Sequence, residues 1–168
     1  MYRRILVPVD GSTSSNLGLK HALNLAKDQR ARVRVLNVVD EMAVLPMMYG
    51  YPDDINTVIE SMREAGKKAI DEGGALARKA RVEAETAIID AHGRVVSDAI
   101  LEQAKKFRAD LIVMGTHGRR GLNRLLLGSD AERVLRSADV PVLLVRGTGT
   151  EKARPKRRGP RRQRASDA

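Results

Sequence analysis

Short aliphatic runs alternate along the chain with longer stretches in which apolar positions recur every three or four residues. The aliphatic runs predict five β-strands, at residues 5–9, 33–39, 82–89, 110–114 and 140–145. The helical spacing predicts a helix beginning at Ser14 or Ser15, and further helices at residues 57–80, 95–107 and 129–137. Strands that alternate with helices predict an α/β fold, a parallel sheet with helices on both faces.

Two stretches interrupt this pattern. Residues 40–56 contain two prolines, Gly50 and a Met-Tyr cluster at residues 47–51, and they predict a long loop. The cluster either forms a lid over a ligand or packs on a neighbouring helix or a second copy, and we favour packing. Gly73-Gly74 is expected to weaken the helix at residues 57–80.

Charge divides the chain into two parts. The net charge is +10, and residues 147–168 contribute +6 of it with almost no apolar residue. This composition predicts one domain at residues 1–146 and a basic, disordered tail at 147–168. The tail either binds a polyanion, such as nucleic acid or acidic lipid, or is a solvated extension, which we favour because it has no aromatic residue to stack on bases.

Composition also excludes several classes of site. The chain has no cysteine, which rules out disulfides, thiolate metal sites and thiol catalysis. No apolar run approaches membrane-spanning length, and none resembles a secretory signal. We therefore expect a cytoplasmic protein.

The candidate chemistry lies in Met114-Gly115-Thr116-His117-Gly118, followed after nine residues by Gly128-Ser129. This segment joins the end of a predicted strand to the start of a predicted helix. We expect its glycines to adopt positive φ and to let the backbone approach a ligand, while the helix amides bind phosphate. The alternative is a turn that needs no ligand, closed by a capping box between Ser129 and Glu132.

Four segments, in this order, resemble the universal stress protein family: Ile5-Leu-Val-Pro-Val-Asp-Gly-Ser12, Ala109-Asp-Leu-Ile-Val-Met-Gly115, the glycine pattern from Gly115 to Ser129, and Val140-Pro-Val-Leu-Leu-Val-Arg146. The resemblance implies a Rossmann-like sheet of five strands in the order 3-2-1-4-5. It also implies a homodimer through the last strand, residues 140–145. The complete glycine pattern places the chain with the family members that bind ATP.

The resemblance also implies the roles of individual residues. Asp10, otherwise equally well explained as a turn former, would hold the adenine or the ribose, and Val38 would contact the base. Other positions line the nucleoside or cradle the phosphates: Pro8, Val9, Met114, Gly115, Gly118, Gly128, Ser129, Asp130 and Ala131.

Asp130 departs from the small apolar residue that family members often have at this position. A carboxylate in the first helical turn would repel a phosphate bound at the same amides. It would therefore either weaken triphosphate binding or hold a bridging Mg²⁺. Arg119, Arg120 and Arg124 in the intervening loop would oppose the repulsion.

The expected function is that of an ATP-binding protein, a nucleotide-dependent sensor or signalling module of the stress response. One alternative is a slow ATPase or phosphotransferase, for which only His117 and Asp130 are placed to contribute. The other alternative is a polyanion-binding protein that acts through its basic tail.

Overall fold

A computed structural model describes residues 1–44, 55–116 and 127–146. In these residues one parallel sheet has the order β3-β2-β1-β4-β5, which confirms the predicted topology. Its strands are β1 (Arg4–Pro8), β2 (Arg32–Val39), β3 (Ala84–Asp90), β4 (Leu111–Gly115) and β5 (Val142–Val145). The proposed division at residue 146 stays a prediction, because the tail at 147–168 lies outside the described residues.

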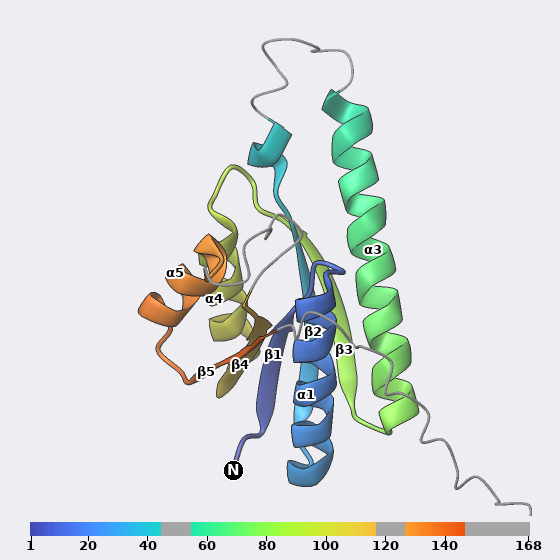
Figure 1. The fold of residues 1–168 in the computed structure, drawn as a ribbon, viewed down its shortest axis with the longest axis vertical. Coiled ribbons are helices and arrows are strands. Elements are labelled where there is room, and N and C mark those ends of the chain that lie inside the picture. The colour runs from blue at the N-terminus through green and yellow to red at the C-terminus, as the bar shows by residue number, and fades with distance from the viewer. Residues whose placement is uncertain (45–54, 117–126, 147–168) are drawn as a thin grey trace, which may run out of the picture.

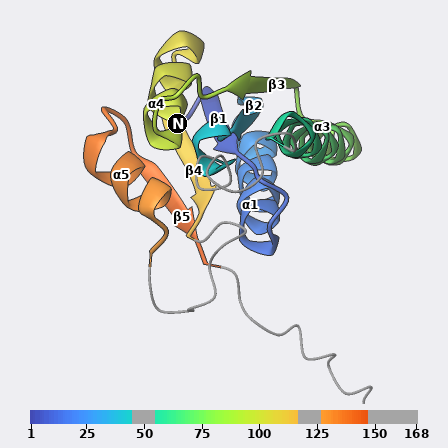
Figure 2. The ribbon, with the colours of Figure 1, turned by 90° about the horizontal axis from the view of Figure 1, so that it is seen from above.

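Helices cover both faces of the sheet, as the strand-helix alternation predicted (Figures 1 and 2). Packed on one face are α1 (Thr13–Gln29) and α3 (Ile55–Ala80), and on the other are α4 (Val96–Phe107) and α5 (Ser129–Ser137). A short 3-10 helix, η1 (Glu41–Val44), follows β2 within the predicted loop. Of the helices in the described ranges, none has both the length and the apolar character that crossing a membrane requires.

The central strand β1 is buried on both sides. Ile5, Leu6 and Val7 are each 0% exposed. Ile5 and Val7 belong to the core beneath α1 and α3, whereas Leu6 belongs to the core beneath α4 and α5. This two-sided burial explains why the strand is a continuous aliphatic run rather than an alternating pattern.

Helix α1 begins earlier than predicted. Its N-cap is Ser12, whose backbone is extended and whose Oγ accepts a hydrogen bond from the Ser15 amide at 3.2 Å. Ser14 and Ser15, the predicted caps, lie in the first helical turn. The prediction was wrong because four hydroxyl residues follow one another at residues 12–15, and the backbone becomes helical directly after the first of them.

Helix α3 continues unbroken through Gly73-Gly74, contrary to the expected weakening. Both glycines are buried against the sheet, and a Cβ added at Gly73 would lie 2.9 Å from Val35 Cγ1. The glycines therefore bring the helix close to β2, and this packing offsets their poor helix propensity. The Met-Tyr cluster at residues 47–51, predicted to be a lid or a packing segment, lies outside the described residues.

Candidate functional site

A cavity of about 450 Å³ lies at the carboxyl ends of the strands. Its walls come from the ends of β1, β2 and β4 and from the first turns of α4 and α5. The strand order reverses between β1 and β4, because the chain builds β2 and β3 on one side of β1 before it crosses to β4 on the other. Ligands of open α/β sheets bind at such a reversal.

Most of the predicted site residues meet at this cavity. Its lining includes Pro8, Val9, Asp10, Val38, Met114, Gly115, Gly128, Ser129, Asp130 and Ala131. Gly118 lies outside the described residues, as do His117, Arg119, Arg120 and Arg124. That the lining residues bind a nucleotide stays a prediction at this point.

Asp10 is held in the turn that joins β1 to α1. Its Oδ1 accepts a hydrogen bond from the Ser12 amide at 3.0 Å, and its own amide donates to Ser15 Oγ at 3.4 Å. Gly11 supplies the left-handed backbone of this turn, with φ at 81°. Asp10 is thus both a turn former and a cavity residue, and the two interpretations offered by the sequence are compatible.

The Asn37 side chain fixes the carbonyl group that precedes Asp10. Asn37 lies in β2, is 5% exposed, and donates from Nδ2 to the Val9 carbonyl oxygen at 2.7 Å. Gly66 of α3 leaves room for it, because a Cβ at Gly66 would lie 2.2 Å from Asn37 Oδ1. No motif marks Asn37 in the sequence, because Arg32 and Arg34 also interrupt the aliphatic residues of β2.

Further lining residues were not predicted as site residues, although Thr116 lies within the glycine motif and Ser15 near the predicted start of the first helix. They come from the β1–α1 turn, β2 and its end, α3, α4 and the end of β4: Ser15, Leu36, Asn37, Val39, Asp40, Met62, Val96, Ile100 and Thr116. Their convergence depends on how distant segments pack, which a single sequence does not reveal.

Gly115 is among the cavity residues, but it lacks the positive φ that was predicted for it. The φ of Gly128, at −63°, is not positive either. A Cβ at Gly115 would lie 2.7 Å from the Ser14 carbonyl carbon and 2.8 Å from the Ser15 nitrogen. The glycine therefore allows the backbone of α1 to pack directly on the end of β4.

The capping box predicted at α5 does not form. Gly128 is the N-cap, with no side-chain cap bond, and Ser129 is already the first helical residue. The Glu132 carboxylate instead pairs with Arg136, one turn along the helix, at 3.6 Å. The Gly128 amide donates to the Thr116 carbonyl oxygen at 2.8 Å, which fixes the start of α5 beside the end of β4.

The described part of the cavity wall is acidic. Asp10, Asp40 and Asp130 line it, whereas no Lys, Arg or His from residues 1–44, 55–116 or 127–146 does. Asp130 lies partly buried in the first turn of α5, next to Ala131, which is 3% exposed. Within these ranges no group of three or more His, Cys, Asp or Glu side chains could hold a metal ion.

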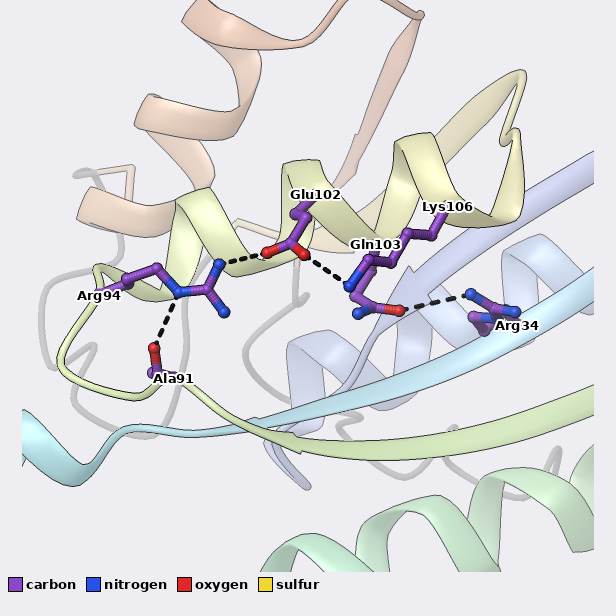
Figure 3. Close-up of polar contacts among 6 residues, drawn as sticks. All are labelled: Arg34, Ala91, Arg94, Glu102, Gln103 and Lys106. Carbon is purple, nitrogen blue, oxygen red and sulfur yellow. Dashed lines mark hydrogen bonds and ion pairs between the residues drawn. The ribbon is translucent and has the colours of Figure 1, made fainter.

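An ion pair between Arg94 and Glu102 ties α4 to the loop that precedes it (Figure 3). The Glu102 carboxylate forms ion pairs with Lys106, whose Nζ lies 2.6 Å away, and with Arg94. Arg94 Nε also donates a hydrogen bond to the Ala91 carbonyl oxygen at 3.2 Å. Lys106 and then Arg94 hold the pKa of Glu102 below its ordinary value.

On the sheet side of α4, Arg34 of β2 holds the helix. Its guanidinium donates to Gln103 at 3.4 Å and lies 4.5 Å from the centre of the Phe107 ring. Such a cation–π contact contributes about 0.5–1 kcal/mol where it is solvated. These contacts fix the helix that supplies one wall of the cavity.

Comparison with known proteins extends over the whole described region. A sequence model of the Universal stress protein family matches residues 1–146. A universal stress protein of Methanocaldococcus jannaschii is 40% identical over 148 residues, covering 87% of this chain and 83% of the relative.

Two solved structures show the same fold. The universal stress protein UspA from Lactobacillus plantarum matches with a TM-score of 0.73 and 25% identity, covering 86% of this chain and 98% of its own. The universal stress protein from Archaeoglobus fulgidus, in complex with dAMP, matches with a TM-score of 0.59 and 26% identity over the same shares of the two chains, 86% and 98%.

Proposed function

Because the chain belongs to the universal stress protein family, we propose that its cavity binds an adenine nucleotide and that it acts as a nucleotide-dependent module of the stress response. The observation that carries this proposal is the convergence of the predicted site residues from β1, β2, β4 and α5 on one cavity. A volume of about 450 Å³ is ample for a nucleoside and its phosphates. The dAMP complex of the Archaeoglobus fulgidus relative supports the choice of adenine.

The chemistry of the lining suggests how the nucleotide lies. Val9 and Val38 offer an apolar wall for the base, and Asp10 offers a carboxylate to ribose hydroxyls or the adenine amine. The first residues of α5, Ser129 to Ala131, line the cavity, and the amides of a helix N-terminus attract phosphates. ATP is the proposed nucleotide because the chain keeps the Gly115, Gly118, Gly128 and Ser129 pattern.

The test combines nucleotide content with a pair of variants. Freshly purified protein is denatured and the released nucleotide is identified, and emptied protein is titrated with ATP by calorimetry. Val96→Trp places a large ring in the cavity, whereas Val95→Trp alters the neighbouring residue, which is 41% exposed and outside the lining. We expect the first variant to lose binding and the second to keep it.

Two results would contradict the proposal: a wild-type protein that neither carries nor takes up a nucleotide, or a folded Val96→Trp protein that binds like wild type. The same samples test hydrolysis. ATP recovered unchanged after incubation with Mg²⁺ agrees with a sensor, whereas ADP that accumulates with time would favour the slow ATPase.

We further propose that the protein dimerises through its last strand, predicted at residues 140–145 and formed by Val142–Val145. This strand lies at an edge of the sheet, and Leu143 is 41% exposed there. Exposed apolar edge strands favour pairing with another chain. In sedimentation experiments Leu143→Lys should be monomeric and Leu135→Lys, on α5, should stay dimeric; a monomeric wild type would refute the proposal.

A further inference from the structure

Three helices end in the same way at the edge of the sheet where the strands begin, opposite the cavity. The residues that follow α1, α3 and α4 are Arg30, Arg81 and Arg108, with left-handed φ values of 55°, 58° and 52°. In each case the amide of the next residue donates to the carbonyl oxygen five positions back, at 2.8–3.0 Å. Such helix ends favour glycine, because the left-handed conformation is strained for a residue with a Cβ. The chain therefore holds arginine at three positions where glycine would be more stable.

These residues belong to an arginine row along the edge of the sheet. Four neighbouring strands, β3, β2, β1 and β4, each follow one exposed arginine: Arg81, Arg30, Arg3 and Arg108, in that order. Because neighbouring strands lie about 4.8 Å apart, the four strands span roughly 15 Å. The Arg32 amide donates to the Arg3 carbonyl oxygen at 2.9 Å and joins two of the turns. In Figure 1 this edge is the lower end of the sheet, where the N-terminus lies.

Positive charge gathers at this edge of the domain. The five segments that lead into the strands are residues 1–4, 27–32, 78–83, 105–110 and 138–141. They carry eleven Lys or Arg against four Asp or Glu, a net charge of +7. Residues 1–146 as a whole carry only +4, so the rest of the domain is net negative. The edge is thus a local basic surface rather than part of a uniformly basic domain.

Three of the four acidic side chains at this edge have other partners. Glu83 and Asp139 form ion pairs with cations outside the arginine row, at 2.7 Å and 3.2 Å. The Asp110 carboxylate accepts hydrogen bonds from the backbone amides of residues 3 and 4, at 2.7 Å and 3.0 Å. Within the described ranges, no arginine of the row forms an ion pair. Their guanidinium groups are available to an anionic partner.

The chemistry of the row fits the phosphates of duplex nucleic acid. Guanidinium groups bind phosphate through paired hydrogen bonds and keep their charge at physiological pH. A duplex carries one charge for about 1.7 Å of its axis, so an edge of roughly 15 Å faces several phosphates. Tyr2 is half-buried against the core and Phe107 is buried, so these segments offer no exposed ring to stack on unpaired bases. A duplex is therefore favoured over a single strand.

An acidic membrane also presents phosphates, but binding at a membrane surface draws on apolar side chains that enter the interface. Of the large apolar side chains exposed in the described part of the chain, Met1 alone belongs to the five segments. We propose that the arginine row binds the phosphate backbone of duplex nucleic acid without sequence preference. This surface lies at the edge of the sheet opposite the cavity, and the proposal does not depend on nucleotide binding there.

The experiment measures the affinity of the full chain for a short fluorescent DNA duplex by anisotropy, at several salt concentrations. The edge variant combines three substitutions at the helix ends: Arg30→Gly, Arg81→Gly and Arg108→Gly. The control variant removes the same charge from exposed helix positions away from the edge: Lys20→Gln, Lys67→Gln and Lys68→Gln.

We expect the edge variant to bind the duplex about tenfold more weakly or worse. The slope of log affinity against log salt should fall by about 2–3, since each phosphate contact contributes about 0.9. The same variant should melt at or above the wild-type temperature, because glycine suits the left-handed positions. The control variant should resemble wild type in duplex affinity and salt slope. Weaker binding by a protein that is no less stable is the result that a purely structural role of the arginines would not give.

Several results would overturn the proposal. One is a wild-type protein that binds no duplex, and another is an edge variant that binds like wild type, which would leave any duplex binding to residues 147–168. Equal losses in the edge and control variants would show an effect of net charge alone. Binding to vesicles of phosphatidylcholine and phosphatidylserine without binding to the duplex would assign the edge to a membrane instead. Should the edge variant be misfolded, asparagine, the other residue that this conformation favours, replaces glycine at the three positions.

Discussion

Gly115→Ala tests whether this glycine serves packing rather than the approach of a ligand. The added Cβ would lie 2.7 Å from the Ser14 carbonyl carbon, 2.8 Å from the Ser15 nitrogen and 2.9 Å from Ser14 Oγ. The approach is reciprocal, because a Cβ at Gly18 of α1 would lie 3.3 Å from the Met114 carbonyl carbon. The start of α1 and the end of β4 are thus in contact through their backbones.

The expected destabilisation is large for a single methyl group. Two of the three atoms met at Gly115 belong to the backbone, so relief requires a movement of α1 rather than a change of rotamer. Overpacking typically lowers the free energy of unfolding by about 1–3 kcal/mol, and because these contacts are short we expect a loss of about 2–3 kcal/mol. For a domain of this size, that loss lowers the melting temperature by roughly 5–10 °C.

Urea unfolding followed by circular dichroism measures the difference. The matched control is Gly74→Ala in α3, whose Cβ would meet Thr86 Cγ2 at 3.3 Å and whose helix propensity improves by about 0.5–1 kcal/mol. We expect the control to unfold at or above the wild-type midpoint. The packing argument would be refuted if the free energy of unfolding of Gly115→Ala were within about 0.5 kcal/mol of wild type, which is the scale of an ordinary surface substitution. If that stable variant lost ATP binding, the glycine would instead be needed for contact with the ligand.

Two further predictions concern stability. Ser97 is 0% exposed, and its hydroxyl has no hydrogen-bond partner among the described residues, so Ser97→Ala should raise the free energy of unfolding by about 1 kcal/mol. Ser61→Ala, which loses an exposed bond to the Val58 carbonyl, is the control, and a less stable Ser97→Ala in urea would contradict the reasoning. Lys106 and Arg94 lower the pKa of Glu102 in the folded protein below its ordinary value of 4.5. Ionised Glu102 therefore stabilises the fold above pH 4.5, and this stabilisation is lost as the pH falls through the lowered pKa of the folded state. Glu102→Gln should therefore melt slightly below wild type at neutral pH, with a difference that vanishes in acid; a difference independent of pH would count against the ion pairs.

The central strands were predictable because they are buried on both faces, whereas the order of the strands was implied only by the family resemblance. Continuous apolar runs such as Ile5 to Val9 can be recognised as strands without any tertiary information. Details that depend on the balance between local conformational preference and tertiary packing were not predictable. Four consecutive hydroxyl residues precede or open α1, and the cap is Ser12 rather than the predicted Ser14 or Ser15. The Gly73-Gly74 pair was expected to weaken α3, because the packing of Gly73 on Val35 cannot be seen in the sequence.

The candidate site was predictable where a motif follows a strand or opens a helix. Asp10 and the Gly128-Ser129 pair are of this kind, and both line the cavity. Asn37 and Met62 also line it but come from the interior of β2 and from α3, and nothing in their neighbours along the chain marks them. The role of Gly115 was also hidden, because its contact, the start of α1, lies a hundred residues earlier in the sequence.

The central place of β1 has a consequence for synthesis. β1 leaves the ribosome before β2, β3, β4 and β5, and its partner on one side, β2, follows soon after, but Ile5 pairs on the other side with Leu111. At about 5–20 residues per second, that partner emerges roughly 5–20 s later. Throughout this interval the nascent chain presents an unsatisfied apolar edge, so a chaperone that shields the first forty residues during translation should raise the yield of folded protein more than one that acts after release.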